Sequence, residues 1–84
     1  MTVIVFATKT DVFTCLEQLS EWGIGGNIVP VPKQLKMGCG LAVGINDNYF
    51  QGAYSLVRRS RYSSFRGIYR VSVRNGVKIL TKLV

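Results

Sequence analysis

The sequence predicts an α+β domain of the ferredoxin-like kind, a βαββαβ chain with one further strand at its end. Short apolar runs and alternating segments are typical of strands, and two longer segments repeat apolar residues at helical spacing. These patterns predict strands at 2–8, 27–31, 41–45, 65–73 and 77–83, and helices over 9–22 and 48–62. Strand, helix, strand, strand, helix, strand is the split βαβ order. We expect both helices on one sheet face, and the other face exposed or covered by a partner subunit.

The first predicted helix carries signals at both of its ends. Thr8 followed three residues later by Asp11 fits a capping box, with aspartate in place of the usual glutamate. Gly23 is placed to end the helix in a left-handed conformation. Between them an apolar stripe, extended by Trp22, repeats at helical spacing: Val12, Cys15, Leu16 and Leu19. We therefore expect Cys15 to be a small buried hydrophobe.

The other elements have equally local signals. The first strand, "TVIVFAT", is almost wholly apolar, which suits a central strand buried on both faces. Pro30 and Pro32 confine the second strand to a sheet edge, because proline cannot donate to the ladder. Asn46 or Asp47 is the expected N-cap of the second helix. Its core-facing stripe is expected to be Phe50, Ala53, Tyr54 and Val57.

Length and composition predict one domain over residues 1–84. Hydrophobic residues make up 48% of the chain, enough for a packed core and against intrinsic disorder. No apolar run approaches the roughly 20 residues that span a bilayer. The opening "MTVIVFAT" has no basic segment or cleavage site typical of a signal peptide, so we interpret it as a strand. A cytoplasmic protein without membrane contact is expected.

The charge balance is strongly basic. Eleven lysines and arginines against four acids give a net charge of +7, and six arginines fall between Arg58 and Arg74. Such a balance favours anionic partners, including nucleic acid, an acidic protein face or an anionic small molecule. It is also what a solvated surface needs to keep a hydrophobic small protein in solution.

Several kinds of chemistry are excluded by what the chain lacks. There is no histidine, so nucleophilic catalysis by a Ser-His or Cys-His pair is absent. Two cysteines are too few for a disulfide scaffold or a closed zinc site, and we expect no metal and no cofactor. The acids suit helix starts and an exposed helix face rather than general acid–base catalysis: Asp11, Glu17, Glu21 and Asp47. The chain is therefore not expected to be an enzyme.

One cysteine stands out by its neighbours. Cys39 lies between Gly38 and Gly40, which permit positive φ and leave the sulfur without bulky neighbours. Converging backbone N–H groups can form an anion-binding nest, and Lys33 and Lys36 add positive potential, so both favour a thiolate. A reactive, accessible sulfur is one interpretation. The other is an ordinary glycine-rich turn in which cysteine is merely a small residue.

Several stretches of the chain together resemble one known family. The opening "VIVFAT", the helix end "EWGI", the strand "IVPVP", the loop "GCGLAV" and the closing "GIYRV" are similar to the DUF3343 family, small proteins described as selenium/sulfur carrier-like. "PVP" and "GCGLA" are the most specific of these. The resemblance covers residues 2–71, so residues 1–71 form a family-like core. It leaves 72–84, which contain the Asn75-Gly76 type I′ turn signal, as a hairpin extension.

The resemblance implies a function for Cys39. It implies that this residue holds a sulfane sulfur or selenium atom as a persulfide or selenopersulfide and passes it on. Gly38, Gly40, Lys33 and Lys36 would form the binding loop around it. The implied partners are a donor enzyme that forms a persulfide and an acceptor enzyme, and donor and acceptor can supply the proton transfers that a carrier lacks.

Two other classes of function remain open from the residues. In an RNA-binding module, Tyr62, Phe65 and Tyr69 would stack bases on the sheet. They are interleaved with the five arginines Arg58, Arg59, Arg61, Arg66 and Arg70. In a ligand-sensing or oligomerising module, the loop 33–40 would hold a small molecule or a second copy, for instance in a homodimer through the open sheet face. Cys39 would then be incidental.

Overall fold

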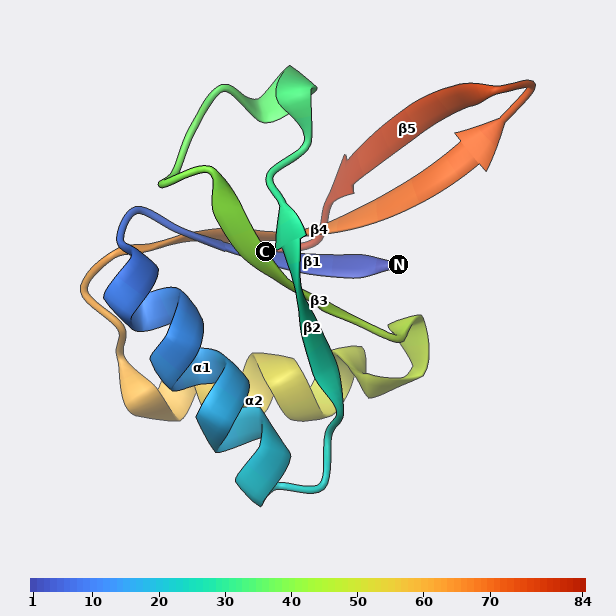
Figure 1. The fold of residues 1–84 in the computed structure, drawn as a ribbon. Coiled ribbons are helices and arrows are strands. Elements are labelled where there is room, and N and C mark those ends of the chain that lie inside the picture. The colour runs from blue at the N-terminus through green and yellow to red at the C-terminus, as the bar shows by residue number, and fades with distance from the viewer.

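Five strands form one antiparallel sheet and two α-helices pack on it in the computed structural model, which describes residues 1–84 (Figure 1). The α+β prediction is confirmed. The elements are β1 (Thr2–Phe6), α1 (Lys9–Glu21), β2 (Gly26–Pro30), η1 (Lys33–Leu35), β3 (Leu41–Ile45), η2 (Asp47–Tyr49), α2 (Phe50–Ser60), β4 (Phe65–Arg74) and β5 (Val77–Lys82). The two η elements are short 3₁₀ turns that the sequence patterns did not predict.

The strands lie in the order β2-β3-β1-β4-β5, and every neighbouring pair is antiparallel. All five residues of β1 are buried, as its unbroken apolar run predicts for a strand between two others. β2 is an edge strand, as its prolines predict, and Pro30 is its last residue. β3, β1 and β4 are therefore the interior strands, and β2 and β5 are the two edge strands.

The larger part of the core lies between the sheet and the helices. Both helices contribute to one buried cluster, together with one face of β1, β3 and β4. We call it the helix-side core: Ile4, Phe6, Val12, Cys15, Leu19, Ile24, Val43, Ile45, Ala53, Leu56, Val57 and Ile68. Trp22 does not extend it as predicted, because its side chain is 44% exposed. In Figure 1 both helices lie below the sheet.

The capping box at the start of α1 forms only in part. The Thr8 hydroxyl accepts the Asp11 N–H at 3.3 Å, as predicted. The Asp11 carboxylate does not return to Thr8 but accepts from the Ser64 hydroxyl at 2.6 Å and the Ser64 N–H at 3.2 Å. Aspartate is one methylene shorter than the usual glutamate. The Ser64 hydroxyl oxygen instead accepts the Thr8 N–H at 3.3 Å, so the cap fixes the start of β4 to α1.

The end of α1 follows the prediction. Gly23 has φ +79°, and the Ile24 N–H bonds back to the Leu19 carbonyl at 2.9 Å. The Gly23 N–H bonds to the Ser20 carbonyl at 3.0 Å. This pair of bonds is the Schellman motif, which needs a residue that tolerates the left-handed conformation.

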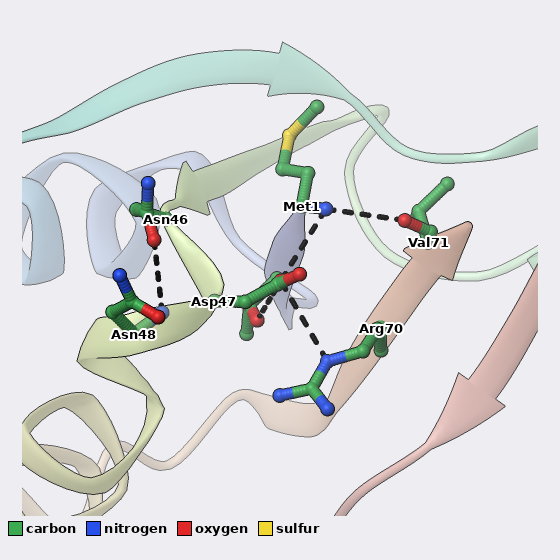
Figure 2. Close-up of polar contacts among 7 residues, drawn as sticks. Met1, Asn46, Asp47, Asn48, Arg70 and Val71 are labelled. Atoms are coloured by element: carbon green, nitrogen blue, oxygen red, sulfur yellow. Dashed lines mark hydrogen bonds and ion pairs between the residues drawn. The ribbon is translucent and has the colours of Figure 1, made fainter. Parts of the chain in front are cut away.

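The second helix begins later than predicted, after η2. Asn46 caps that turn, with its side-chain oxygen accepting the Asn48 N–H at 2.9 Å. Asp47 has another function, shown in Figure 2: its Oδ1 accepts the Thr2 hydroxyl at 2.8 Å and lies 3.3 Å from the Met1 amine and 3.6 Å from Arg70 Nε. The Thr2 hydrogen bond chiefly, then the two cations, lower the pKa of Asp47 below its usual value.

The β4–β5 hairpin extends beyond the rest of the sheet (Figure 1). Asn75 and Gly76 have φ +52° and +77°, as a type I′ turn requires, so this turn prediction is confirmed. The β1–β4 pairing ends at Thr2 and Arg70, while β4 continues to Arg74. Beyond that point the hairpin has no sheet neighbour, and Val73 and Val77 are 69% and 62% exposed.

Candidate functional site

The segment that carries Cys39 is a closed loop from Val31 to Gly40. The Val31 N–H donates to the Gly40 carbonyl at 3.1 Å, which brings the two ends of the loop together. Within it, the Leu35 N–H bonds to the Pro32 carbonyl at 3.0 Å to form η1. Lys36 follows with φ +44°, so the chain reverses there in a left-handed conformation. The loop therefore has a defined conformation of its own, held by backbone hydrogen bonds, and does not simply connect two strands.

The loop folds over the sheet face opposite the helices. Leu35 and Met37 pack against a second buried cluster on that face, formed by Val3, Val5, Ala42 and Tyr69. The Tyr69 hydroxyl lies 4.0 Å from the Met37 sulfur, close enough for a weak hydrogen bond. From the sequence we expect this face to be exposed or covered by a partner subunit. Within the chain itself, Leu35 and Met37 pack over these four residues, because alternate loop residues present these two side chains to the sheet.

The two glycines beside Cys39 are required for different reasons. Both have a positive φ, which glycine permits: +83° at Gly38 and +90° at Gly40. A Cβ on Gly38 would lie 2.8 Å from the Phe6 carbonyl oxygen and 3.2 Å from the Val5 side chain, so this glycine also allows close packing on β1. A Cβ on Gly40 would meet nothing within 4 Å. Gly40 is therefore required only for its backbone conformation.

The Cys39 side chain is partly buried and lies on the other side of the loop from Met37. It packs against the helix-side core, and its thiol lies 3.5 Å from the Leu41 carbonyl oxygen, to which it donates. Lys33 and Lys36 are exposed, and neither makes an ion pair or a side-chain hydrogen bond. The lysines can therefore act on the sulfur only through their positive potential.

A small hollow lies beside the loop. Its volume is about 280 Å³, and it is lined by Val31, Pro32, Lys33, Lys36, Met37, Gly38 and Gly40. All four residues proposed from the sequence to surround Cys39 line this hollow. The Cys39 side chain itself does not, because it turns towards the helix-side core. The structure thus brings the two lysines and two glycines together around the hollow. The Cys39 sulfur lies next to them, on the side of the loop that faces the helix-side core.

The other cysteine is fully enclosed. Cys15 has no exposed surface and lies within the helix-side core, so the predicted structural role of this residue is confirmed. Burial raises the pKa of its thiol to about 12, because the charged form loses hydration; a hydrogen bond with Tyr62 opposes the shift and the Asp11 charge adds to it. Cys15 is a protonated core side chain at neutral pH.

The aromatic residues of the RNA-binding interpretation do not form an exposed platform. Tyr69 is 6% exposed, beneath the loop that contains Met37. The rings of Tyr62 and Phe65 pack edge-on against Phe6, with centroids 5.1 and 6.0 Å away. These rings belong to the core, so base stacking on the sheet has no support in this structure.

Two further observations bear on the class of protein. No group of three or more His, Cys, Asp or Glu residues is positioned to hold a metal ion. None of the helices is long and apolar enough to cross a membrane.

Comparison with known proteins identifies a family. Searches of curated proteins and of solved structures find no match. A family model described as Se/S carrier protein-like matches residues 1–70, which confirms the resemblance inferred from the sequence motifs. The match contains the whole Cys39 loop and ends within β4, so that most of the β4–β5 hairpin lies outside it. Since it covers far more than half of the 84 residues, the chain belongs to the Se/S carrier protein-like family.

Proposed function

We propose that the protein carries a sulfur or selenium atom on Cys39, as a persulfide or selenopersulfide, between a donor and an acceptor protein. The observation that carries this proposal is the contrast between its two thiols. Cys15 is enclosed in the core, whereas Cys39 lies in the Val31–Gly40 loop and is partly exposed to solvent. Family membership supports the same class of cargo.

The transfer step needs one nucleophile. The Cys39 thiolate attacks the outer sulfur of a donor persulfide, R–S–SH; the new Cys39 S–S bond forms, the donor S–S bond breaks, and the donor leaves as R–S⁻. A thiolate of the acceptor then attacks the outer sulfur of Cys39–S–SH and releases the Cys39 thiolate. Each exchange conserves atoms and electrons, and a selenopersulfide reacts in the same way. No oxidant, metal or cofactor enters either step.

The loop contributes access and charge. In the thiol form Cys39 donates to the Leu41 carbonyl. A thiolate has no proton to donate, so ionisation removes this hydrogen bond and leaves the side chain free to turn towards solvent. Gly38 and Gly40 present no side chains that would block a donor. Lys33 and Lys36 place two ammonium groups at the hollow beside the loop, which both glycines also line. Positive potential favours the approach of an anionic persulfide.

The proposed role is that of a carrier, not of a catalyst with turnover. The chain has no histidine, and no carboxylate lies in the Val31–Gly40 loop. Proton transfers would therefore be made by the donor and acceptor enzymes, which are the proposed partners. A reducing compartment such as the cytoplasm would keep both cysteines available as thiols.

We also propose that the fold is of the ferredoxin-like class. The first four strands have the order β2-β3-β1-β4 with antiparallel neighbours, and both helices pack into the same buried cluster. This is the arrangement expected when two βαβ halves interleave. β5 is then an addition on the outer edge of β4.

Intact mass spectrometry after incubation with a persulfide donor tests the proposed function. Wild type and Cys15→Ala should each gain about 32 Da, and Cys39→Ser should gain nothing, because exposure and thiolate character decide which sulfur reacts. A second incubation with a small thiol should remove the added mass. Equal labelling of wild type and Cys39→Ser, or no labelling of wild type under conditions in which free cysteine is labelled, would refute the proposal.

A further inference from the structure

The arginines at the end of α2 form a surface that lies outside the Cys39 loop. Arg58 and Arg59 lie in the last turn of the helix, and Arg61 is the residue directly after it. All three are exposed. Together with Gln51, Tyr54 and Ser55 they line an open hollow of about 640 Å³ on the outer face of α2. We call these six residues the α2 surface.

The charge of the α2 surface is not neutralised within the molecule. Both ion pairs of the protein are made by Asp47, and neither involves Arg58, Arg59 or Arg61. Two of the three guanidinium groups are held over aromatic rings: Arg58 is 5.5 Å from the Tyr54 ring centroid, and Arg59 is 5.7 Å from that of Trp22. Stacking of this kind occupies the flat face of a guanidinium group and leaves its N–H edge free to bind an anion.

A stabilising effect on the helix explains only part of this arrangement. Cations in the last turn interact favourably with the helix dipole, which accounts for Arg58 and Arg59. Arg61 has φ +50°, the left-handed position at which glycine is usual and other residues are strained. An arginine there has a cost in stability, and a binding role for its charge explains why the position is basic.

We propose that the α2 surface binds the phosphate groups of a nucleic-acid strand. Guanidinium groups pair with phosphate oxygens through two parallel hydrogen bonds, and Gln51 and Ser55 add neutral donors beside them. A protein partner is less suited, because protein interfaces depend on buried apolar anchors and Tyr54 is the single hydrophobic residue of this lining. Recognition here is of the backbone and differs from the base stacking on the sheet that the structure does not support.

Fluorescence anisotropy with a labelled single-stranded RNA of 12 nucleotides is a direct test. The triple variant Arg58→Gln, Arg59→Gln, Arg61→Gln should bind at least about tenfold more weakly, and the slope of log affinity against log salt should fall by about 2. The control triple variant Arg74→Gln, Lys78→Gln, Lys82→Gln removes the same charge from the hairpin and should bind nearly as wild type does. Equal losses in the two triple variants would overturn the proposal, since net charge alone would then explain binding.

Two competitors separate the sources of an anion. One competitor is pyrophosphate, and the other is polyglutamate with the same number of charges as the RNA. Each should displace the labelled RNA only at a far higher concentration than unlabelled RNA does. Displacement by pyrophosphate at similar concentration would assign the surface to a small phosphate ligand, and displacement by polyglutamate to an acidic protein; either result would overturn the nucleic-acid proposal. Labelling of Cys39 by a persulfide donor should be unchanged in the α2 triple variant, so the two proposals can fail independently.

The single variant Arg61→Gly tests the role of Arg61 separately from that of Arg58 and Arg59. Relief of the left-handed strain should raise the thermal midpoint of unfolding by a few degrees, while RNA affinity falls. An Arg61→Gly protein that binds RNA as tightly as wild type would contradict the assignment of Arg61.

Discussion

The two cysteines of this chain have the same chemistry and opposite surroundings. Cys15 faces the core from the middle of a regular helix, where neighbours on α1, α2 and the sheet enclose it completely. Cys39 lies on irregular backbone between two glycines with positive φ, partly open to solvent. In a regular helix, the position of a residue in the sequence fixes the direction in which its side chain points. In a loop between glycines, that direction depends on the φ and ψ angles of each residue. The backbone around each sulfur therefore decides how far that sulfur is exposed.

Alkylation should show the largest difference between the two sites. With a pKa of about 12, the Cys15 thiol is ionised in only about one molecule in 10⁵ at pH 7, and it has no solvent contact. We expect iodoacetamide to modify Cys39 more than about 100-fold faster than Cys15 in the folded protein, since the thiolate is the nucleophile. Peptide mapping over a time course measures both rates.

Urea is the control for the alkylation experiment. In the unfolded chain the two rates should become similar, because the burial of Cys15 is lost. Similar rates in the folded protein would show that the helix-side core opens readily, and the contrast between the two thiols would not hold.

The glycines beside Cys39 should differ in their tolerance of a side chain. Gly38→Ala adds strain at φ +83° and a Cβ only 2.8 Å from the Phe6 carbonyl oxygen, so we expect a loss of about 3 kcal/mol in the free energy of unfolding. Gly40→Ala adds strain at φ +90° but no contact within 4 Å, and should lose about 1 kcal/mol. Urea unfolding of the two matched variants measures the difference. Equal losses would mean that the loop does not pack on β1 as described.

Regular elements were predictable from the sequence because their signals are local. The apolar run of β1, the stripe of α1, the glycine after it and the Asn-Gly turn each specify their own conformation within a few residues. α2 began two residues later than predicted, because Asn46 caps a separate 3₁₀ turn. The predicted stripe of α2 also missed Leu56, which is buried at 4% exposure.

The geometry of the candidate site was less predictable, because it depends on contacts between distant segments. The sequence identified Cys39, Gly38, Gly40, Lys33 and Lys36 as neighbours in a loop. It gave no sign that Leu35 and Met37 anchor that loop over the open sheet face, since isolated apolar residues in a loop have no periodicity to interpret. The Asp11–Ser64 hydrogen bonds could not be predicted either, because they join residues that are 53 positions apart in the sequence.

Alkaline pH should destabilise the protein through Cys15. The folded-state pKa of about 12 lies above the usual value of 9.0, so the unfolded chain releases this proton first and stability falls as pH rises from about 9 towards 12. We expect wild type to lose about 2 to 3 kcal/mol more than Cys15→Ala between pH 8 and pH 11, measured by urea unfolding at each pH. Burial, and then the neighbouring Cys15, also raise the pKa of Tyr62, so the alkaline loss that Cys15→Ala removes includes a part that depends on Tyr62.

Cys39→Ala serves as the matched control for this pH dependence. It removes the other thiol and leaves Cys15 enclosed in the core, so the alkaline loss that depends on Cys15 should persist. If Cys15→Ala and wild type showed the same dependence on pH, the thiol of Cys15 would not be protected by burial, and its assignment as a core side chain would be contradicted.

The smallest expected effect lies at the opposite end of β3 from Cys39, where Asp47 joins Thr2, the Met1 amine and Arg70 (Figure 2). The lowered pKa of Asp47 means that its contribution to stability is present above about pH 4 and is lost as pH falls through the folded-state pKa. Because the carboxylate is largely exposed, Asp47→Asn should cost only about 0.5 kcal/mol at pH 6 and progressively less as the pH falls below about 4, while Glu17→Gln should have no such effect. Asp47→Asn should also leave the alkylation rates of both cysteines unchanged. A faster Cys39 reaction in this variant would show that the ion pairs at one end of the sheet hold the loop at the other, and that the surroundings of the two thiols are not independent.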